Sequence, residues 1–148
     1  MTRVMALHCI ALAWRVELLY CARYDACCPQ EPPLLEPADL ARRVVDLLAD
    51  RQAEDILLLD VRKVASFADF FVIATAANPR QMRALVNTVA KELRAEDVRA
   101  AGQEGDGDSG WVLIDYGDVI VHLFSPELRE YYGLEELWKA ATPVVRIQ

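Results

Sequence analysis

The feature that most constrains the fold of this chain is a pair of apolar runs on either side of Gly117 and Asp118, in the segment WVLIDYGDVIVHLF at residues 111–124. Glycine followed by a turn-forming residue, between runs rich in β-branched and aromatic residues, is typical of a two-residue β-hairpin turn. Such a turn fixes the register, because each residue before it then lies opposite one residue after it. The predicted pairs are Trp111 with Phe124, Leu113 with His122, and Asp115 with Ile120.

This register divides the hairpin into two faces, because alternate residues of a strand point to opposite sides of the sheet. One face is predicted to belong to the core and carries Val112, Ile114, Tyr116, Val119, Val121 and Leu123. The other, which we call the mixed face, carries Trp111, Leu113, Asp115, Ile120, His122 and Phe124. Aromatic residues with a few polar groups suit a protein interface. The alternative is that a helix covers this face and that His122 hydrogen-bonds to a neighbour.

Hydrophobic periodicity predicts the elements around the hairpin. Helices are expected over residues 37–52, from Pro79 to residue 97 with Asn78 as its cap, and over 126–132 and 134–140. Strands are expected over residues 54–63, 69–76 and, more weakly, 98–103, and residues 143–148 are expected to form an extended tail. This order predicts an α/β protein, more narrowly α+β, with a single domain built on one mixed sheet of about five strands with flanking helices.

Composition narrows the class of partner. The chain has 148 residues and a formal net charge of −7, with a sequence pI near 4.8. An acidic surface repels the phosphate backbone, so direct sequence-specific binding of nucleic acid is not expected. The apolar run at residues 4–14 is shorter than the roughly 20 residues that a membrane helix needs, and no membrane association is expected. The composition favours a protein partner or a small molecule.

The first 34 residues differ from the rest of the chain. All four cysteines lie there, and their only close pair is the adjacent Cys27 and Cys28, which does not have the spacing of a zinc site. Four prolines follow between residues 29 and 37. We expect residues 1–34 to be a poorly ordered extension and proline-rich lead-in, from a start assigned too far upstream or from an organelle presequence, and residues 35–148 to form the domain.

Motifs of common enzymes are absent from the sequence. It contains no G-x-S-x-G, no phosphate-binding G-x-x-x-x-G-K-[ST], no G-x-G-x-x-G and no H-E-x-x-H. The loop EGDGDSG at residues 104–110 resembles a calcium loop, but its glycine falls at the seventh place where the sixth is required. We therefore predict no catalytic residue, no metal site and no cofactor. The rival hypothesis is a metal-dependent nucleotidyltransferase that uses Asp60, Asp115 and Asp118.

Several separated motifs occur in a characteristic order between residues 37 and 138. They are Asp60-Val61-Arg62-Lys63, SFADFFVIAT at 66–75, Arg80-Gln81, Glu104-Gly105 ahead of Trp111, DYGDVIVH at 115–122, and Tyr132 followed by Leu134, Glu135, Leu137 and Trp138. In these motifs the chain resembles the Iojap family of ribosomal silencing factors. It departs from the family at Ala76-Ala77-Asn78, where many members have Gly-x-Ser, and at Val64-Ala65, where serine-rich sequence is common.

The resemblance implies a non-enzymatic protein with a nucleotidyltransferase-like shape that lacks the catalytic residues. It implies binding to the large ribosomal subunit through its fourteenth protein, so that the small subunit is sterically blocked and translation is repressed when nutrients are limiting. The residues matched to the family's docking hairpin are Trp111, Asp115, Gly117, Asp118 and His122, and we extend the docking surface to Leu113, Phe124, Arg129 and Tyr132. Asparagine in place of serine at position 78 still allows a helix cap.

Alternatives stay open at this point. The same surface would serve an assembly factor for the large subunit. The protein is expected to be a monomer or a weak homodimer, and to act in a bacterial cytoplasm or, alternatively, in an organelle matrix.

Overall fold

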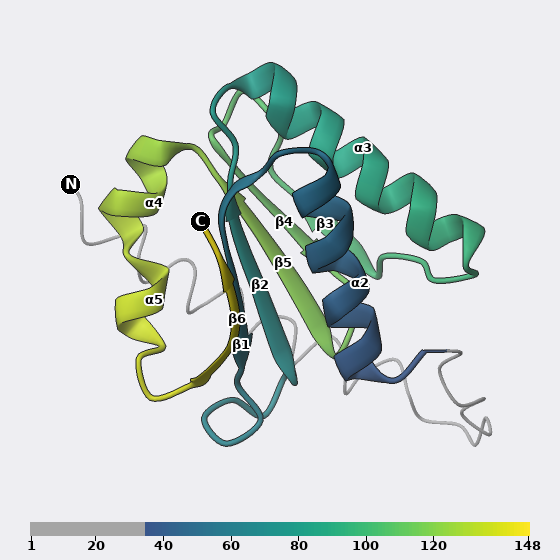
Figure 1. Cartoon of the computed structure of the whole chain (residues 1–148), viewed down its shortest axis with the longest axis vertical. Helices are drawn as coiled ribbons and strands as arrows, with labels where there is room; N and C mark the ends of the chain where they lie inside the picture. Colours follow the sequence, from purple (N-terminus) through teal and green to yellow (C-terminus); the bar gives the residue numbers. More distant parts are fainter. Residues whose placement is uncertain (1–34) are drawn as a thin grey trace. The chain divides into compact units, whose positions relative to one another are not determined.

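The computed structural model describes residues 35–148, so the predicted extension over residues 1–34 lies outside the described residues. A six-stranded sheet lies between two pairs of helices, with α2 and α3 on one face and α4 and α5 on the other (Figure 1). The elements are α2 (Pro37–Asp50), β1 (Glu54–Asp60), β2 (Phe70–Thr75), α3 (Pro79–Ala95), β3 (Gly102–Glu104), β4 (Trp111–Asp115), β5 (Val119–Phe124), α4 (Pro126–Tyr132), α5 (Leu134–Leu137) and β6 (Thr142–Ile147). The predicted α+β class with one mixed sheet is confirmed.

The strand order is β3-β4-β5-β2-β1-β6. β2 and β5 run parallel, and every other neighbouring pair is antiparallel, which makes the sheet mixed. The sheet has six strands where about five were predicted, because the expected extended tail pairs with β1 as the edge strand β6. The weak strand predicted over residues 98–103 is shorter and lies at Gly102–Glu104.

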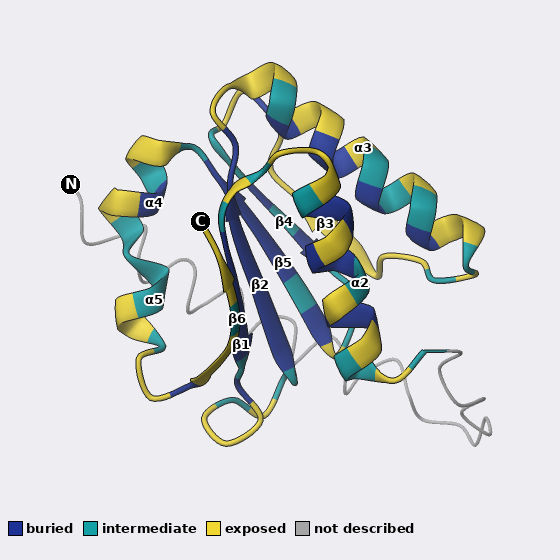
Figure 2. Ribbon diagram, in the orientation of Figure 1, coloured by how far each residue is buried: buried dark blue, intermediate teal, exposed yellow. Residues whose placement is uncertain are grey.

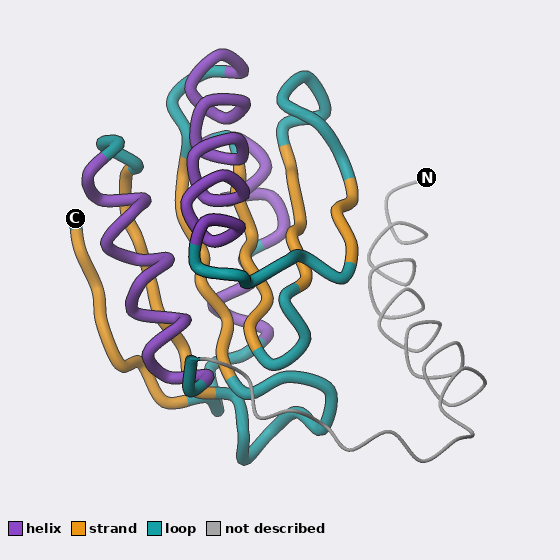
Figure 3. Tube along the Cα trace, turned by 90° about the vertical axis from the view of Figure 1, so that its right-hand side faces the viewer, coloured by secondary structure: helices purple, strands orange, loops and turns teal. Residues whose placement is uncertain are grey.

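The two longer helices owe their positions to apolar stripes and to their first turns. α2 begins at Pro37 and buries Leu40, Val44, Leu47 and Leu48, as its periodicity predicts. In Figure 3, turned by 90° from Figure 1, α2 and α3 lie in front of the strands. α3 is capped by Asn78, whose side chain accepts a hydrogen bond from the backbone N–H of Gln81 at 2.8 Å. The Gln81 side chain in turn accepts from the N–H of Ala77 and donates to the carbonyl of Gln52, so it joins the start of α3 to the end of α2.

The hairpin has the predicted register. Trp111 lies opposite Phe124, Leu113 opposite His122, and Asp115 opposite Ile120. Gly117 has a φ of 86°, which a residue without a Cβ adopts at no steric cost. The Asp115 carboxylate accepts a hydrogen bond from the Gly117 N–H at 2.7 Å and so stabilises the turn.

Two hydrophobic clusters lie on the two faces of the sheet. The larger one joins α2 and α3 to one face and includes Val112, Ile114, Val119, Val121 and Leu123, so the core face of the hairpin was predicted correctly. The smaller one, on the other face, includes Phe71, Ile73 and Phe124, with Tyr132 and Trp138 packed against it. Figure 2 shows the central strands as buried and the outer faces of the helices as exposed.

The cap of α3 yields a prediction about stability. Replacing Asn78 with alanine leaves the Gln81 N–H without its acceptor and should lower the free energy of unfolding by about 1 kcal/mol, whereas Asn78→Ser should keep most of it. Urea unfolding followed by circular dichroism measures both variants. Equal stability of the alanine and serine variants would show that the cap contributes little.

Candidate functional site

The mixed face is built from two neighbouring strands of the sheet. Trp111, Leu113 and Asp115 come from β4, and Ile120, His122 and Phe124 come from β5. Trp111 and Phe124 are stacked, with ring centroids 5.1 Å apart and an interplanar angle of 21°. The structure therefore brings together the six side chains that the register places on this face.

Helices α4 and α5 cover only part of the mixed face. The Tyr132 ring lies 5.1 Å from that of Trp111, and the Trp138 ring lies 5.2 Å from that of Phe71 on β2. Phe124 and His122 are buried beneath this cover, with 0% and 6% exposure. The three residues that β4 contributes to this face, Trp111, Leu113 and Asp115, are half-buried, and so is Ile120 of β5. A helical cover and an accessible strip thus occur side by side on one face.

His122 is an internal residue. Its ring meets Phe71 edge-on at 5.4 Å and stacks with Phe124 at 6.2 Å. Burial lowers its pKa to about 4, so the imidazole is neutral at physiological pH. Within residues 35–148 its Nδ1 has no hydrogen-bond partner. His122 therefore packs beneath the aromatic residues of the mixed face, against Phe71, Trp111 and Phe124.

Arg129 is also buried, at 8% exposure, and joins α4 to the sheet. Its guanidinium forms ion pairs with Glu135 at 2.8 Å and Asp55 at 3.1 Å. It also donates to the Thr75 hydroxyl at 2.8 Å and to the Asp55 carbonyl. These contacts hold α4 and α5 against β1 and β2. A role of Arg129 in docking stays a prediction. If Arg129 contributes to docking, these contacts let it do so by holding α4 and α5 in place.

Gly117 and Asp118 form the tip of the hairpin. Gly117 is half-buried and Asp118 is exposed. The Asp118 carbonyl accepts hydrogen bonds from the backbone N–H groups of Asp69 at 2.8 Å and Phe70 at 3.0 Å, which attach the tip to the start of β2. The Asp118 side chain is left toward solvent.

The carboxylates of the rival hypothesis do not converge. β5 and β2 lie between β4 and β1, so the backbone of Asp115 is separated from that of Asp60 by three strand spacings, about 14 Å. The Asp60 carboxylate is paired with Arg62, whose Nε donates a hydrogen bond to Asp60 Oδ1 at 3.0 Å. This hydrogen bond holds the pKa of Asp60 below its ordinary value. Among the described residues, no three His, Cys, Asp or Glu side chains are placed to hold a metal ion.

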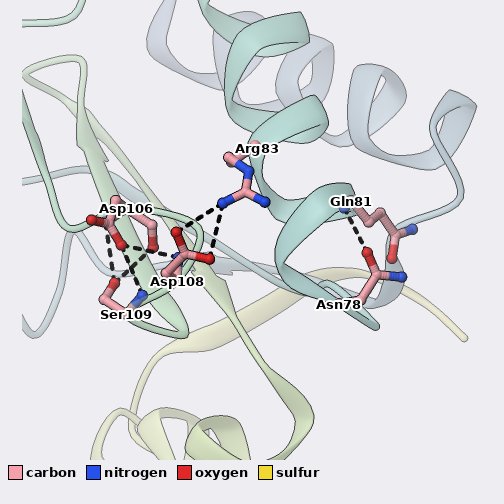
Figure 4. A network of polar contacts seen from close by, with 6 residues as sticks. All are labelled: Asn78, Gln81, Arg83, Asp106, Asp108 and Ser109. Carbon is pink, nitrogen blue, oxygen red and sulfur yellow. Dashed lines mark hydrogen bonds and ion pairs between the residues drawn. The ribbon is translucent and has the colours of Figure 1, made fainter.

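The loop at residues 104–110 has an internal structural role. The Asp106 carboxylate accepts from the N–H groups of Asp108 and Ser109, and Asp108 forms an ion pair with Arg83 of α3 at 2.9 Å (Figure 4). The sequence spacing gave no sign of the Arg83 contact, because the two residues come from distant segments. Asp106 thus closes a turn, and Asp108 attaches this loop to α3.

The fold and the mixed face together define the class of this protein. It is a single-domain α+β protein with a mixed sheet, one face of which carries aromatic residues and is covered only in part by α4 and α5. A family model described as "Ribosomal silencing factor during starvation" matches residues 35–148. The chain belongs to this family of ribosomal silencing factors, whose role lies in the regulation of translation. In the described part of the chain, no helix is both long enough and apolar enough to span a membrane.

Named relatives and solved structures agree with this assignment. The chain is 36% identical to "Ribosomal silencing factor RsfS" of Chromobacterium violaceum over 109 residues, which cover 74% of this chain and 89% of the relative. It is 33% identical to the mouse "Mitochondrial assembly of ribosomal large subunit protein 1" over 98 residues, covering 64% of this chain and 43% of that protein. A crystal structure of a Chromobacterium violaceum protein matches with a TM-score of 0.69 at 34% identity, covering 77% of this chain and 95% of that one.

Burial of His122 predicts a pH dependence of stability. The unfolded chain binds a proton at this residue near pH 6.5, whereas the folded pKa is about 4, so stability is fully present above about pH 6.5 and falls as the pH is lowered. Between about pH 7.5 and about pH 5.5 the loss should be roughly 1 kcal/mol. His122→Leu should remove this part of the slope. Urea unfolding at both pH values measures it, and an unchanged slope in the variant would contradict the assignment.

Proposed function

We propose that this protein binds the large ribosomal subunit through its fourteenth protein and sterically prevents the small subunit from joining, so that translation is repressed when nutrients are limiting. The single observation that carries the proposal is the mixed face, which α4 and α5 cover only in part and where Trp111 is half-buried, whereas α2 and α3 close the opposite face of the sheet. Membership of the ribosomal silencing family supports the proposal. Steric blocking requires binding and no catalytic group. This suits a domain in which Asp60, Asp106 and Asp108 take part in structural contacts.

The proposed docking surface has an accessible layer and a supporting layer. The accessible layer consists of Trp111, Leu113, Asp115, Gly117, Asp118 and the half-buried Tyr132. The supporting layer consists of the buried residues His122, Phe124 and Arg129. In the accessible layer the aromatic edges give affinity, since aromatic residues near the centre of an interface contribute most of its binding energy. The supporting layer keeps those edges in place.

The acidity of the chain fits a basic ribosomal protein as partner. A net charge of −7 speeds encounter with a positively charged surface and disfavours contact with ribosomal RNA. The protein would act as a monomer or weak homodimer in a bacterial cytoplasm, or alternatively in an organelle matrix. We assign it no direct sequence-specific contact with nucleic acid.

A second candidate function is assistance in the assembly of the large subunit. It is favoured by the similarity to the mouse relative, whose name refers to mitochondrial assembly of the large subunit. The same docking surface would serve both functions. Sucrose-gradient sedimentation separates them, because silencing predicts fewer joined ribosomes when the protein is added, whereas assembly predicts fewer mature large subunits when it is removed.

Trp111→Ala tests the proposal and its docking surface together. Truncation of an interface aromatic weakens binding by about 2 to 4 kcal/mol, so the variant should neither sediment with large subunits nor reduce the fraction of joined ribosomes. Trp111 also stacks on Phe124, so circular dichroism must show a native fold. Leu113→Lys, at a half-buried position, is the second variant and should give the same loss.

Two outcomes would contradict this proposal. Large subunits that fail to bind the unaltered protein would exclude the function itself. Normal binding by both folded variants would instead place the docking surface elsewhere on the molecule.

A further inference from the structure

The mixed face continues beyond β4 onto the edge strand β3. Gly102 pairs with Asp115, and Glu104 pairs with Leu113. Residues directly opposite each other in an antiparallel pair project to the same side of the sheet. Glu104 therefore stands on the mixed face beside Leu113, and position 102 contributes to the same face beside Asp115. Gln103, between them, projects to the opposite side and pairs with Ile114.

Gly102 leaves a space on this part of the face. A Cβ built on it would meet no atom within 4 Å. The space is bordered by Asp115 directly opposite and by Leu113 and Glu104 one pair further along the strands. Diagonal neighbours in such a pair lie roughly 7 to 8 Å apart, and their Cβ atoms somewhat less, so the carboxylates of Glu104 and Asp115 can both reach the charged end of one side chain.

In the described part of the chain, neither of the two carboxylates forms an ion pair. Within residues 35–148, the described ion pairs use other acidic residues, and the one described contact of the Asp115 side chain is with the Gly117 N–H. Glu104 is exposed and Asp115 is half-buried. The next residue in the same cross-strand row is the buried His122, which is neutral at physiological pH and supplies no positive charge. This corner of the mixed face is thus apolar in the middle and negative on both sides.

We propose that this corner receives a lysine or arginine side chain of the ribosomal partner, with Glu104 and Asp115 as its counter-charges; this inference rests on the proposed function. The aliphatic stem lies over Gly102 against Leu113, and the charged end lies between the carboxylates. Glu104 thereby becomes a specificity-determining residue of the docking surface, and β3 becomes part of it.

A basic protein side chain fits this corner better than the other occupants. A second copy of the chain packed about a two-fold axis that passes through this corner would bring the same carboxylates toward each other. An RNA phosphate would meet two negative charges. The partner's Lys or Arg is the occupant whose charge complements the corner and whose stem matches its apolar floor.

The inference is tested by the binding of salt-washed large ribosomal subunits to charge variants of the full chain. Glu104→Gln should weaken binding about fivefold to tenfold at low salt, and the difference should shrink as salt is raised. Asp46→Asn is the matched control, because it removes the same charge from the exposed side of α2 and should stay within about twofold of the unaltered protein. A local contact predicts this difference between the two variants, whereas general electrostatic attraction predicts equal effects.

A steric pair of variants tests the space itself. Gly102→Trp fills the space without meeting the protein and should abolish binding, whereas Gln103→Trp places the same ring on the opposite side of β3 and should leave binding unchanged. Circular dichroism establishes that both variants are folded. Sedimentation velocity of the free proteins establishes whether either variant alters self-association.

Four results would overturn this inference. Glu104→Gln and Asp46→Asn with equal effects would show that the charge acts only at long range. Gly102→Trp with normal subunit binding but altered self-association would make a second copy the occupant. Loss of binding in Trp111→Ala together with normal binding in Glu104→Gln and Gly102→Trp would contradict this inference and leave the proposed function standing. Failure of the unaltered protein to bind would contradict both.

Discussion

The two-residue turn at Gly117 and Asp118 is the constraint on which the other features of the molecule depend. A slip of one residue in the pairing of β4 with β5 would turn one strand over relative to the other, so that Val112 would lie on the side of His122 and Trp111 on the side of Val121. The positive φ of Gly117 and the hydrogen bond that it donates to Asp115 stabilise the observed register. The larger cluster can then close against α2 and α3, and the aromatic residues are left for the opposite side.

Unequal cover on the two sides of the sheet connects this register to function. α2 and α3 bury their side with long apolar stripes, whereas α4 and α5 are short and reach only part of the mixed face. On a sheet face that helices cover only in part, the aromatic side chains under the helices are held rigidly, and those at the edge of the helices stay accessible. Phe124 is an example of the first kind and Trp111 of the second. Such an arrangement suits the centre of an interface, where ordered aromatic residues are surrounded by polar ones.

Local signals in the sequence predicted a large part of this structure, and contacts between distant segments account for the rest. The hairpin register, the Asn78 cap and the stripe of α2 each depend on residues close together in the chain, and each was confirmed. Strand β6 was missed because its pairing with β1 leaves no mark on the exposed tail sequence. The ion pairs of Arg129 could not be predicted, and the sequence left open whether a helix covers His122, since both depend on where α4 and α5 pack. The docking residues inferred from the family resemblance remain a proposal.

The contacts of Arg129 have a consequence for the thermodynamics of binding. One guanidinium joins α4 to Asp55 and Thr75 of the sheet and to Glu135 of α5, so the segment that carries Tyr132 is fixed before any partner arrives. Ordering a flexible segment at an interface consumes part of the interaction free energy, and a segment that is already ordered avoids this loss. In the proposed complex, binding would therefore lose little free energy to the ordering of this segment.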